Sequence, residues 1–80
     1  MKRIIDSNKS NIIGERVKQA RLKKNYSQKQ LSVKLELMAV YICRGSISRI
    51  ENGERMVSDI EIDALSKVLN VSLDYLFGRD

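Results

Sequence analysis

The chain has no histidine, no proline and no tryptophan, and Cys43 is its single cysteine. Zinc clusters, disulfide frameworks and histidine general bases are therefore not expected. The longest apolar run, residues 37–43, is seven residues and far too short for a membrane span. The N-terminal residues carry charge before any apolar segment of signal length. These absences predict a cytoplasmic protein that has no metal, cofactor or membrane partner, and the lone cysteine suits a reducing compartment.

The 80 residues have the composition of one small globular domain, residues 1–80, with 42% hydrophobic and 31% charged side chains. Positive charge is concentrated at the beginning. Residues 1–34 carry ten basic and two acidic side chains, a net charge of +8, whereas residues 35–80 carry five basic and eight acidic ones, a net charge of −3. This separation favours a polyanionic partner on one face, although a solvated helix surface would have the same composition.

Helical signals dominate, and no stretch alternates with period two for long enough to predict a strand, apart from a weak case at residues 40–43. Arg21 falls on the apolar stripe of the first expected helix, an unusual position for a charge. Ser27 with Gln30 forms a capping-box pattern that begins the second helix. Five helices are expected, over residues 11–25, from residue 27 onward, and over residues 43–52, 58–70 and 72–77. Leu31 and Leu35 form the inner face of the second helix, and Gly53 closes the third. The predicted fold class is all-α.

Residues 43–52 separate into two faces when they are placed 100° apart around a helix. Cys43, Ile47 and Ile50 fall on the inner side, where Cys43 is interpreted as a small hydrophobe rather than a redox centre. Small polar and arginine side chains occupy the other face and suit the major groove, since arginine can bond O6 and N7 of guanine together. An ordinary solvated helix face remains the alternative. The outward residues are Arg44, Gly45, Ser48, Arg49 and Asn52.

A series of motifs then occurs in one order along the chain. It consists of Ile13-Gly14-Glu15-Arg16-Val17, Arg21, Ser27-Gln28, Leu31, Leu35, residues 47–55 (ISRIENGER) and residues 64–78 (ALSKVLNVSLDYLFG). In this order the motifs resemble the phage-repressor/Cro-type (XRE-like) helix-turn-helix family over about residues 12–78, with residues 1–10 as an N-terminal arm. The resemblance implies a compact five-helix, lambda-repressor-like DNA-binding domain whose third helix lies in the major groove.

The resemblance also implies roles for individual residues. By the resemblance, Gln28 binds a DNA phosphate and supports the third helix, which reads the bases. By the same resemblance, Arg21 and Glu51 form a structural salt bridge. Base-reading positions and positions near the DNA backbone complete the set. The candidate DNA-binding residues are Arg16, Ser27, Gln28, Arg44, Gly45, Ser46, Ser48, Arg49, Asn52 and Arg55.

Two features depart from the family pattern. Eleven residues, 36–46, separate Leu35 from Ile47, more than the family usually has. The surplus around residues 37–42 is apolar and is interpreted as a longer second helix plus a longer turn. Gly45 has no side chain with which to read a base, so it serves either helix flexibility or a close approach of the backbone to DNA.

These observations favour a sequence-specific DNA-binding transcriptional regulator of phage- or mobile-element repressor type. It would bind double-stranded DNA as a homodimer on a two-fold operator. The two copies would contact each other through a surface on the acidic half that includes Leu73, Leu76 and Phe77. The sequence contains no nucleophile–base pattern that would indicate an enzyme, and no small-molecule ligand is evident. The alternative is an antitoxin- or antirepressor-like protein-binding module that uses the same fold.

Overall fold

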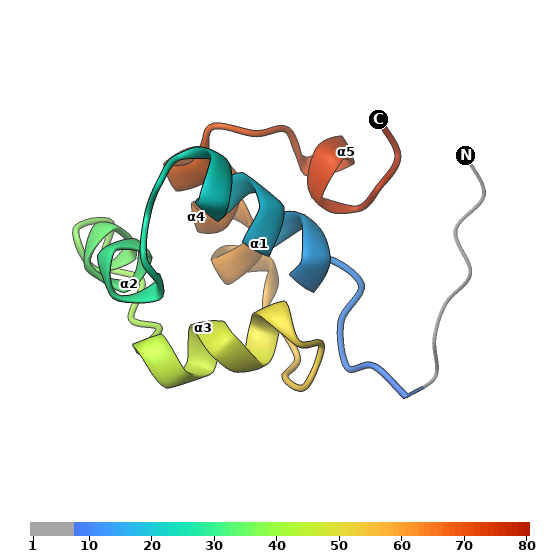
Figure 1. Cartoon of the computed structure of the whole chain (residues 1–80), viewed down its shortest axis with the longest axis horizontal. Helices are drawn as coiled ribbons and strands as arrows, with labels where there is room; N and C mark the ends of the chain where they lie inside the picture. The colour runs from blue at the N-terminus through green and yellow to red at the C-terminus, as the bar shows by residue number, and fades with distance from the viewer. Residues whose placement is uncertain (1–7) are drawn as a thin grey trace.

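The computed structural model describes residues 8–80, and within that range it contains five helices and no strand (Figure 1). The predicted all-α fold is confirmed, whereas residues 1–7 of the expected N-terminal arm lie outside the described residues. None of the described helices has the length and apolar character needed to cross a membrane. The helices are α1 (Gly14–Lys23), α2 (Gln28–Glu36), α3 (Arg44–Glu51), α4 (Asp59–Leu69) and α5 (Leu73–Leu76).

Serine caps begin three of these helices. The hydroxyl of Ser27 accepts from the Gln30 amide at 3.0 Å, and that of Ser58 accepts from the Glu61 amide at 3.2 Å. Both caps are reciprocated by the side chain of the third helical residue, which satisfies two otherwise free amides at each helix start. Ser72 caps α5 in the simpler, one-way manner. Because these patterns are local, the starts of α2, α4 and α5 agree with the sequence.

The core lies between α1 and the other helices. In Figure 1, α3 lies along the bottom, the α4–α5 connection runs along the top, and α1 lies between them; α1 contacts α3, α4 and α5. Leu76, expected on a dimer surface, is fully buried and belongs to this core, because α5 packs against both α1 and α4. Leu73 remains 47% exposed. The buried hydrophobic residues are Ile13, Val17, Ala20, Leu31, Leu35, Ile42, Ile47, Ile50, Ala64, Leu65, Leu69 and Leu76.

The surplus residues between α2 and α3 form a connection and do not lengthen α2. The chain leaves the helix after Glu36, and Ala39 adopts a left-handed conformation at φ 61°. The Val40 amide then donates to the Leu35 carbonyl at 3.0 Å, a bond that closes a helix end. The expectation of a longer second helix was therefore wrong, since the apolar composition of this segment does not reveal the left-handed residue.

A single residue of the apolar run anchors this connection to the core. Ile42 is 2% exposed, and its carbonyl accepts from the Ser32 hydroxyl at 2.7 Å. In contrast, Leu37 is 82% and Tyr41 is 76% exposed. The connection thus presents large apolar side chains at the surface beside the start of α3.

Candidate nucleic-acid interface

The orientation of α3 is determined by its buried side. Ile47 and Ile50 are fully buried, whereas Arg44 and Arg49 are exposed on the other side of the helix. Gly45 is also exposed, and a Cβ added there would meet nothing within 4 Å. Of the remaining predicted positions, Ser46 and Ser48 are half-buried, and Asn52 is exposed just after the helix. The face predicted to read bases is therefore exposed to solvent at its arginines.

Cys43 is exposed and does not pack inward as the helical projection suggested. It precedes the helix as the N-cap, in extended backbone at φ −71° and ψ 164°, so the 100° spacing does not apply to it. Its thiol and the Ser46 hydroxyl are hydrogen-bonded at 3.4 Å, and this bond lowers the pKa of the Cys43 thiol. Cys43 therefore belongs to the polar start of α3, and the assignment to the core was wrong.

A buried polar network connects α3 to α1 and α2. The guanidinium of Arg21 donates to both carboxylate oxygens of Glu51, at 2.6 and 3.1 Å, and to the Tyr26 carbonyl at 2.8 Å. The Gln28 amide donates to the same carboxylate at 3.1 Å. Arg21 is 7% and Glu51 is 6% exposed. Since two donors on different helices converge on Glu51, the carboxylate restrains the rotation of α3 against α1 and α2.

The segment before α1 binds the far end of α3, and the sequence analysis missed this contact. The Asn11 amide donates to the carbonyls of Ile50 at 3.0 Å and Arg55 at 2.8 Å. Its carbonyl oxygen accepts from the Gly14 amide at 2.9 Å, as a helix cap does. Lys9 adds a bond from its ammonium to the Asn52 carbonyl at 2.9 Å. Asn11 lies two residues before the N-cap Ile13, and its bonds to α3 are visible only in three dimensions.

Arg16 lies with the C-terminal residues and not on the open face of α3. Its guanidinium donates to the Tyr75 carbonyl and to both carboxylate oxygens of Asp80, each at 3.2 Å, and lies 4.7 Å from the centre of the Tyr75 ring. The bond from Arg16 lowers the pKa of Asp80. The structure therefore does not bring Arg16 together with the other predicted DNA-binding residues.

Arg55 follows α3 and is paired with an acid at the start of α4. Its two terminal nitrogens donate to the two carboxylate oxygens of Glu61, at 3.0 and 2.9 Å, in a bidentate geometry. The bond from Arg55 is the main reason that the pKa of Glu61 lies below its ordinary value. One carboxylate thus caps α4 and holds the α3–α4 connection.

The arrangement provides an exposed polar surface around α3. Within residues 8–80 there is no group of three or more His, Cys, Asp or Glu side chains placed to hold a metal ion. Ser27 and Gln28 lie at the start of α2, next to the network that holds α3. The residues brought together around α3 are Ser27, Gln28, Arg44, Gly45, Ser46, Ser48, Arg49, Asn52 and Arg55.

Comparisons with known proteins agree with this geometry. A family model described as helix-turn-helix matches residues 17–76. The HTH-type transcriptional regulator ImmR of Bacillus subtilis (strain 168) is 37% identical over 71 residues, which cover 85% of this chain. The chain spans 50% of the length of that relative.

Two solved structures share the fold. The P22 c2 repressor, in complex with the synthetic operator 9T, superposes with a TM-score of 0.73 at 30% identity, over 88% of this chain and 98% of the repressor chain. The restriction-modification controller protein C.AhdI from Aeromonas hydrophila superposes with a TM-score of 0.70 at 28% identity, over 81% of this chain and 87% of its own. Together with the order of motifs and the placement of α2 and α3, these matches show that the chain belongs to the phage-repressor/Cro-type helix-turn-helix family.

Proposed function

We propose that this protein is a sequence-specific DNA-binding transcriptional regulator of the repressor type. The observation that carries the proposal is the orientation of α3, whose apolar side is fully buried while Arg44 and Arg49 project from the exposed side. A helix held in this way can enter the major groove as a rigid unit, where arginine reads guanine through two donors. The net charge of +5 supports a polyanionic partner.

The relatives support the same function. ImmR is a transcriptional regulator by name, and the P22 c2 repressor is bound to a synthetic operator. Both are similar to this chain over most of its length. By analogy the protein occupies an operator and blocks or recruits polymerase; it has no catalytic role.

The hydrogen-bonding groups of α2 and α3 suggest a division of roles. Gln28 uses one amide N–H on Glu51 and keeps a second N–H for a phosphate, and the Ser27 hydroxyl can donate to a phosphate while it accepts from Gln30. Arg44 and Arg49 read bases, and Gly45 lets the helix backbone lie close to the DNA. Ser46, Ser48, Asn52 and Arg55 supply shorter contacts around this centre.

A homodimer on a two-fold operator is part of the proposal, because one α3 offers few base contacts. Three of the large apolar side chains in the acidic half lie after α3, are exposed and can be covered by a second copy. Met56 is 79%, Ile60 is 69% and Leu73 is 47% exposed. Met56 and Ile60 therefore join Leu73 as candidates for the dimer surface, in place of the buried Leu76.

Selection of bound sequences from random duplexes tests the proposal. We expect enriched sites with inverted symmetry and guanine in each half-site. The double variant Arg44→Ala with Arg49→Ala should lose the enrichment, while Lys67→Ala, an exposed change on α4, should retain it. Absence of any enriched sequence with the unmodified protein would overturn the assignment.

The second candidate function is a protein-binding module of antitoxin or antirepressor type. The exposed apolar connection favours it, since Leu37 and Tyr41 are 82% and 76% exposed and lie next to the start of α3. A gel shift separates the two functions. If Leu37→Ser with Tyr41→Ser leaves binding to selected DNA intact and Arg49→Ala relaxes its base preference, the regulator is correct; if no duplex binds, the module is favoured.

A further inference from the structure

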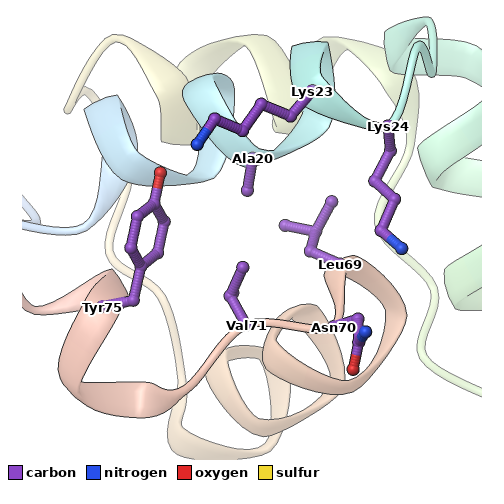
Figure 2. Close-up of a pocket in the computed structure, with 7 residues that line it drawn as sticks. All are labelled: Ala20, Lys23, Lys24, Leu69, Asn70, Val71 and Tyr75. Atoms are coloured by element: carbon purple, nitrogen blue, oxygen red, sulfur yellow. The ribbon is translucent and has the colours of Figure 1, made fainter.

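A hollow of about 430 Å³ lies between the end of α1, the end of α4 and the turn into α5 (Figure 2). Its floor is apolar and consists of Ala20, Leu69 and Val71. Ala20 and Leu69 are 2% and 1% exposed, so the floor is continuous with the core. A hollow of this size can hold a small organic ligand, since such sites occupy about 300–1,000 Å³.

The rim of the hollow carries positive charge and no acid. Lys23 and Lys24, at the end of α1, stand on two sides of it (Figure 2). In the same view Lys23 extends toward Tyr75, and Lys24 extends toward Asn70. Neither lysine takes part in an ion pair among residues 8–80. The lining thus combines an apolar floor with two ammonium groups that lack a counter-ion in this part of the chain.

The reading helix contributes nothing to this site. All the lining residues belong to α1, its C-cap, α4, α5 and the connection between α4 and α5, whereas α3 lies along the other side of the molecule in Figure 1. A ligand in the hollow would therefore leave the exposed face of α3 free. The site is independent of the proposed function, because its argument uses no contact with DNA.

We propose that this hollow binds a small amphipathic carboxylate, with a medium-chain acyl body on the floor and the carboxylate at the lysines. The apolar body removes the floor from water, which is the main source of affinity. The carboxylate replaces solvent at Lys23 or Lys24, and the long, flexible stems of these lysines let either ammonium reach it. The Asn70 amide adds a hydrogen-bond donor at the rim, whereas the Tyr75 hydroxyl already donates to the Gln19 side chain at 3.5 Å.

A titration followed by two-dimensional amide NMR tests the proposal, with octanoate as the probe and octan-1-ol as its uncharged counterpart. Octanoate is expected to shift the amides of Ala20, Leu69, Asn70 and Val71 in a saturable manner, and octan-1-ol to bind more weakly. The double variant Lys23→Gln with Lys24→Gln should weaken octanoate binding by about tenfold, since both ammonium groups that can reach the carboxylate are lost. Lys18→Gln with Lys29→Gln removes the same charge elsewhere and should change little.

A second variant tests the floor. Val71→Glu places an acid on the floor, where the acyl body is expected, and should abolish binding, while circular dichroism checks that the fold is retained. The proposal is overturned if octanol binds as well as octanoate, if the two lysine pairs behave alike, or if the shifts centre on exposed apolar residues such as Leu37 and Tyr41. Absence of saturable shifts also overturns it. No operator is present in the assay, so none of these outcomes depends on the proposed function.

Discussion

Arg21 is a cation inside the domain, and each end of its guanidinium has a partner. It donates to both oxygens of Glu51 and to the Tyr26 carbonyl. Removing two charges from water is costly, and good geometry between them compensates that cost only while both are present. The pair therefore fixes the position of α3 in the fold, and loss of either member leaves an unmatched buried charge.

At the residue scale, Glu51→Ala should lower the free energy of unfolding by about 3 kcal/mol, because Arg21 loses its counter-ion in a buried site. Gln28 loses its acceptor in the same variant. Urea denaturation measures the change. Glu36→Ala, an exposed acid at the end of α2, is the matched control and should change stability by less than about 0.5 kcal/mol. Equal, small losses in both variants would contradict a buried pair.

Arg49 and Gln28 should affect DNA binding in different ways. Arg49→Ala should cost about 1–3 kcal/mol on the best site and relax the preference at one base pair in each half-site. Gln28→Ala should weaken binding to all sequences alike, since phosphates carry no sequence information. Affinities for a panel of single-base operator variants measure both effects. The opposite pattern, with Gln28 setting base preference, would mean that α3 is rotated from the position described here.

At the scale of the elements, two helical glycines have opposite surroundings. A Cβ on Gly14 would clash with the Ile50 carbonyl oxygen, so the start of α1 touches the end of α3 through backbone. A Cβ on Gly45 would meet nothing within 4 Å. Gly14 is therefore required by packing, whereas Gly45 has no role in the isolated fold beyond weakening α3.

Alanine substitutions at the two glycines should consequently shift stability in opposite directions. Gly45→Ala should raise the free energy of unfolding by about 0.5–1 kcal/mol through helix propensity. Gly14→Ala should lower it, because the Ile50 carbonyl belongs to the backbone and cannot move aside easily. Thermal melting measures both. If Gly45→Ala also weakens operator binding, Gly45 serves a close approach to DNA; unchanged binding would leave helix flexibility as its role.

The start of α4 should respond to acid through Glu61. The bond from Arg55 holds the pKa of Glu61 below its ordinary value, so the unfolded chain takes up this proton at a higher pH than the folded chain. The stabilisation is present above the unfolded pKa, about 4.3, and is lost as the pH falls through the lower folded pKa. Denaturant titrations measure the free energy of unfolding at each pH. From neutral to acidic pH, this free energy should fall less steeply for Glu61→Gln than for the unmodified protein.

Asp63→Asn is the control for this pH experiment. Asp63 makes an exposed ion pair with Lys67 at 2.9 Å, and exposed pairs contribute little to stability. The variant changes the net charge by the same amount as Glu61→Gln. Its free energy of unfolding should fall with pH as steeply as that of the unmodified protein. The same slope in both variants would contradict the role assigned to the Arg55–Glu61 pair.

At the scale of the whole molecule, the small reading surface predicts a dimeric footprint. Two copies of α3 must meet the same side of the duplex, so the half-sites should be centred about 10 bp apart or at a multiple of that distance. Gel shifts on operators with altered spacing measure this. An insertion of about 5 bp, half a helical turn, should reduce affinity strongly, whereas tolerance of any spacing would indicate that monomers bind independently.

Local signals in the sequence were sufficient for the fold class and for most helix starts. The serine caps at Ser27, Ser58 and Ser72 act over three residues, so the information they need is contiguous in the chain. The order of motifs indicated the family, and the helical spacing of Ile47 and Ile50 placed the exposed arginines of α3 on the opposite face. The Arg21–Glu51 pair came from the resemblance alone, since no local pattern connects residues that far apart.

Tertiary structure decided the features that depend on distant or conformational partners. The left-handed residue Ala39 ends α2 without a compositional signal, and Cys43 is exposed because it precedes the helix. Arg16 is bound by Asp80, 64 positions away, and Asn11 reaches the end of α3. Charge and spacing predict that an arginine or an asparagine will find a partner, but which partner it finds depends on how the helices pack. By itself, therefore, the sequence determined the all-α class, the family and the serine-capped helix starts. The packing of α1 and α3 with the described segments before α1 and after α5 determined which polar groups remain free for a ligand.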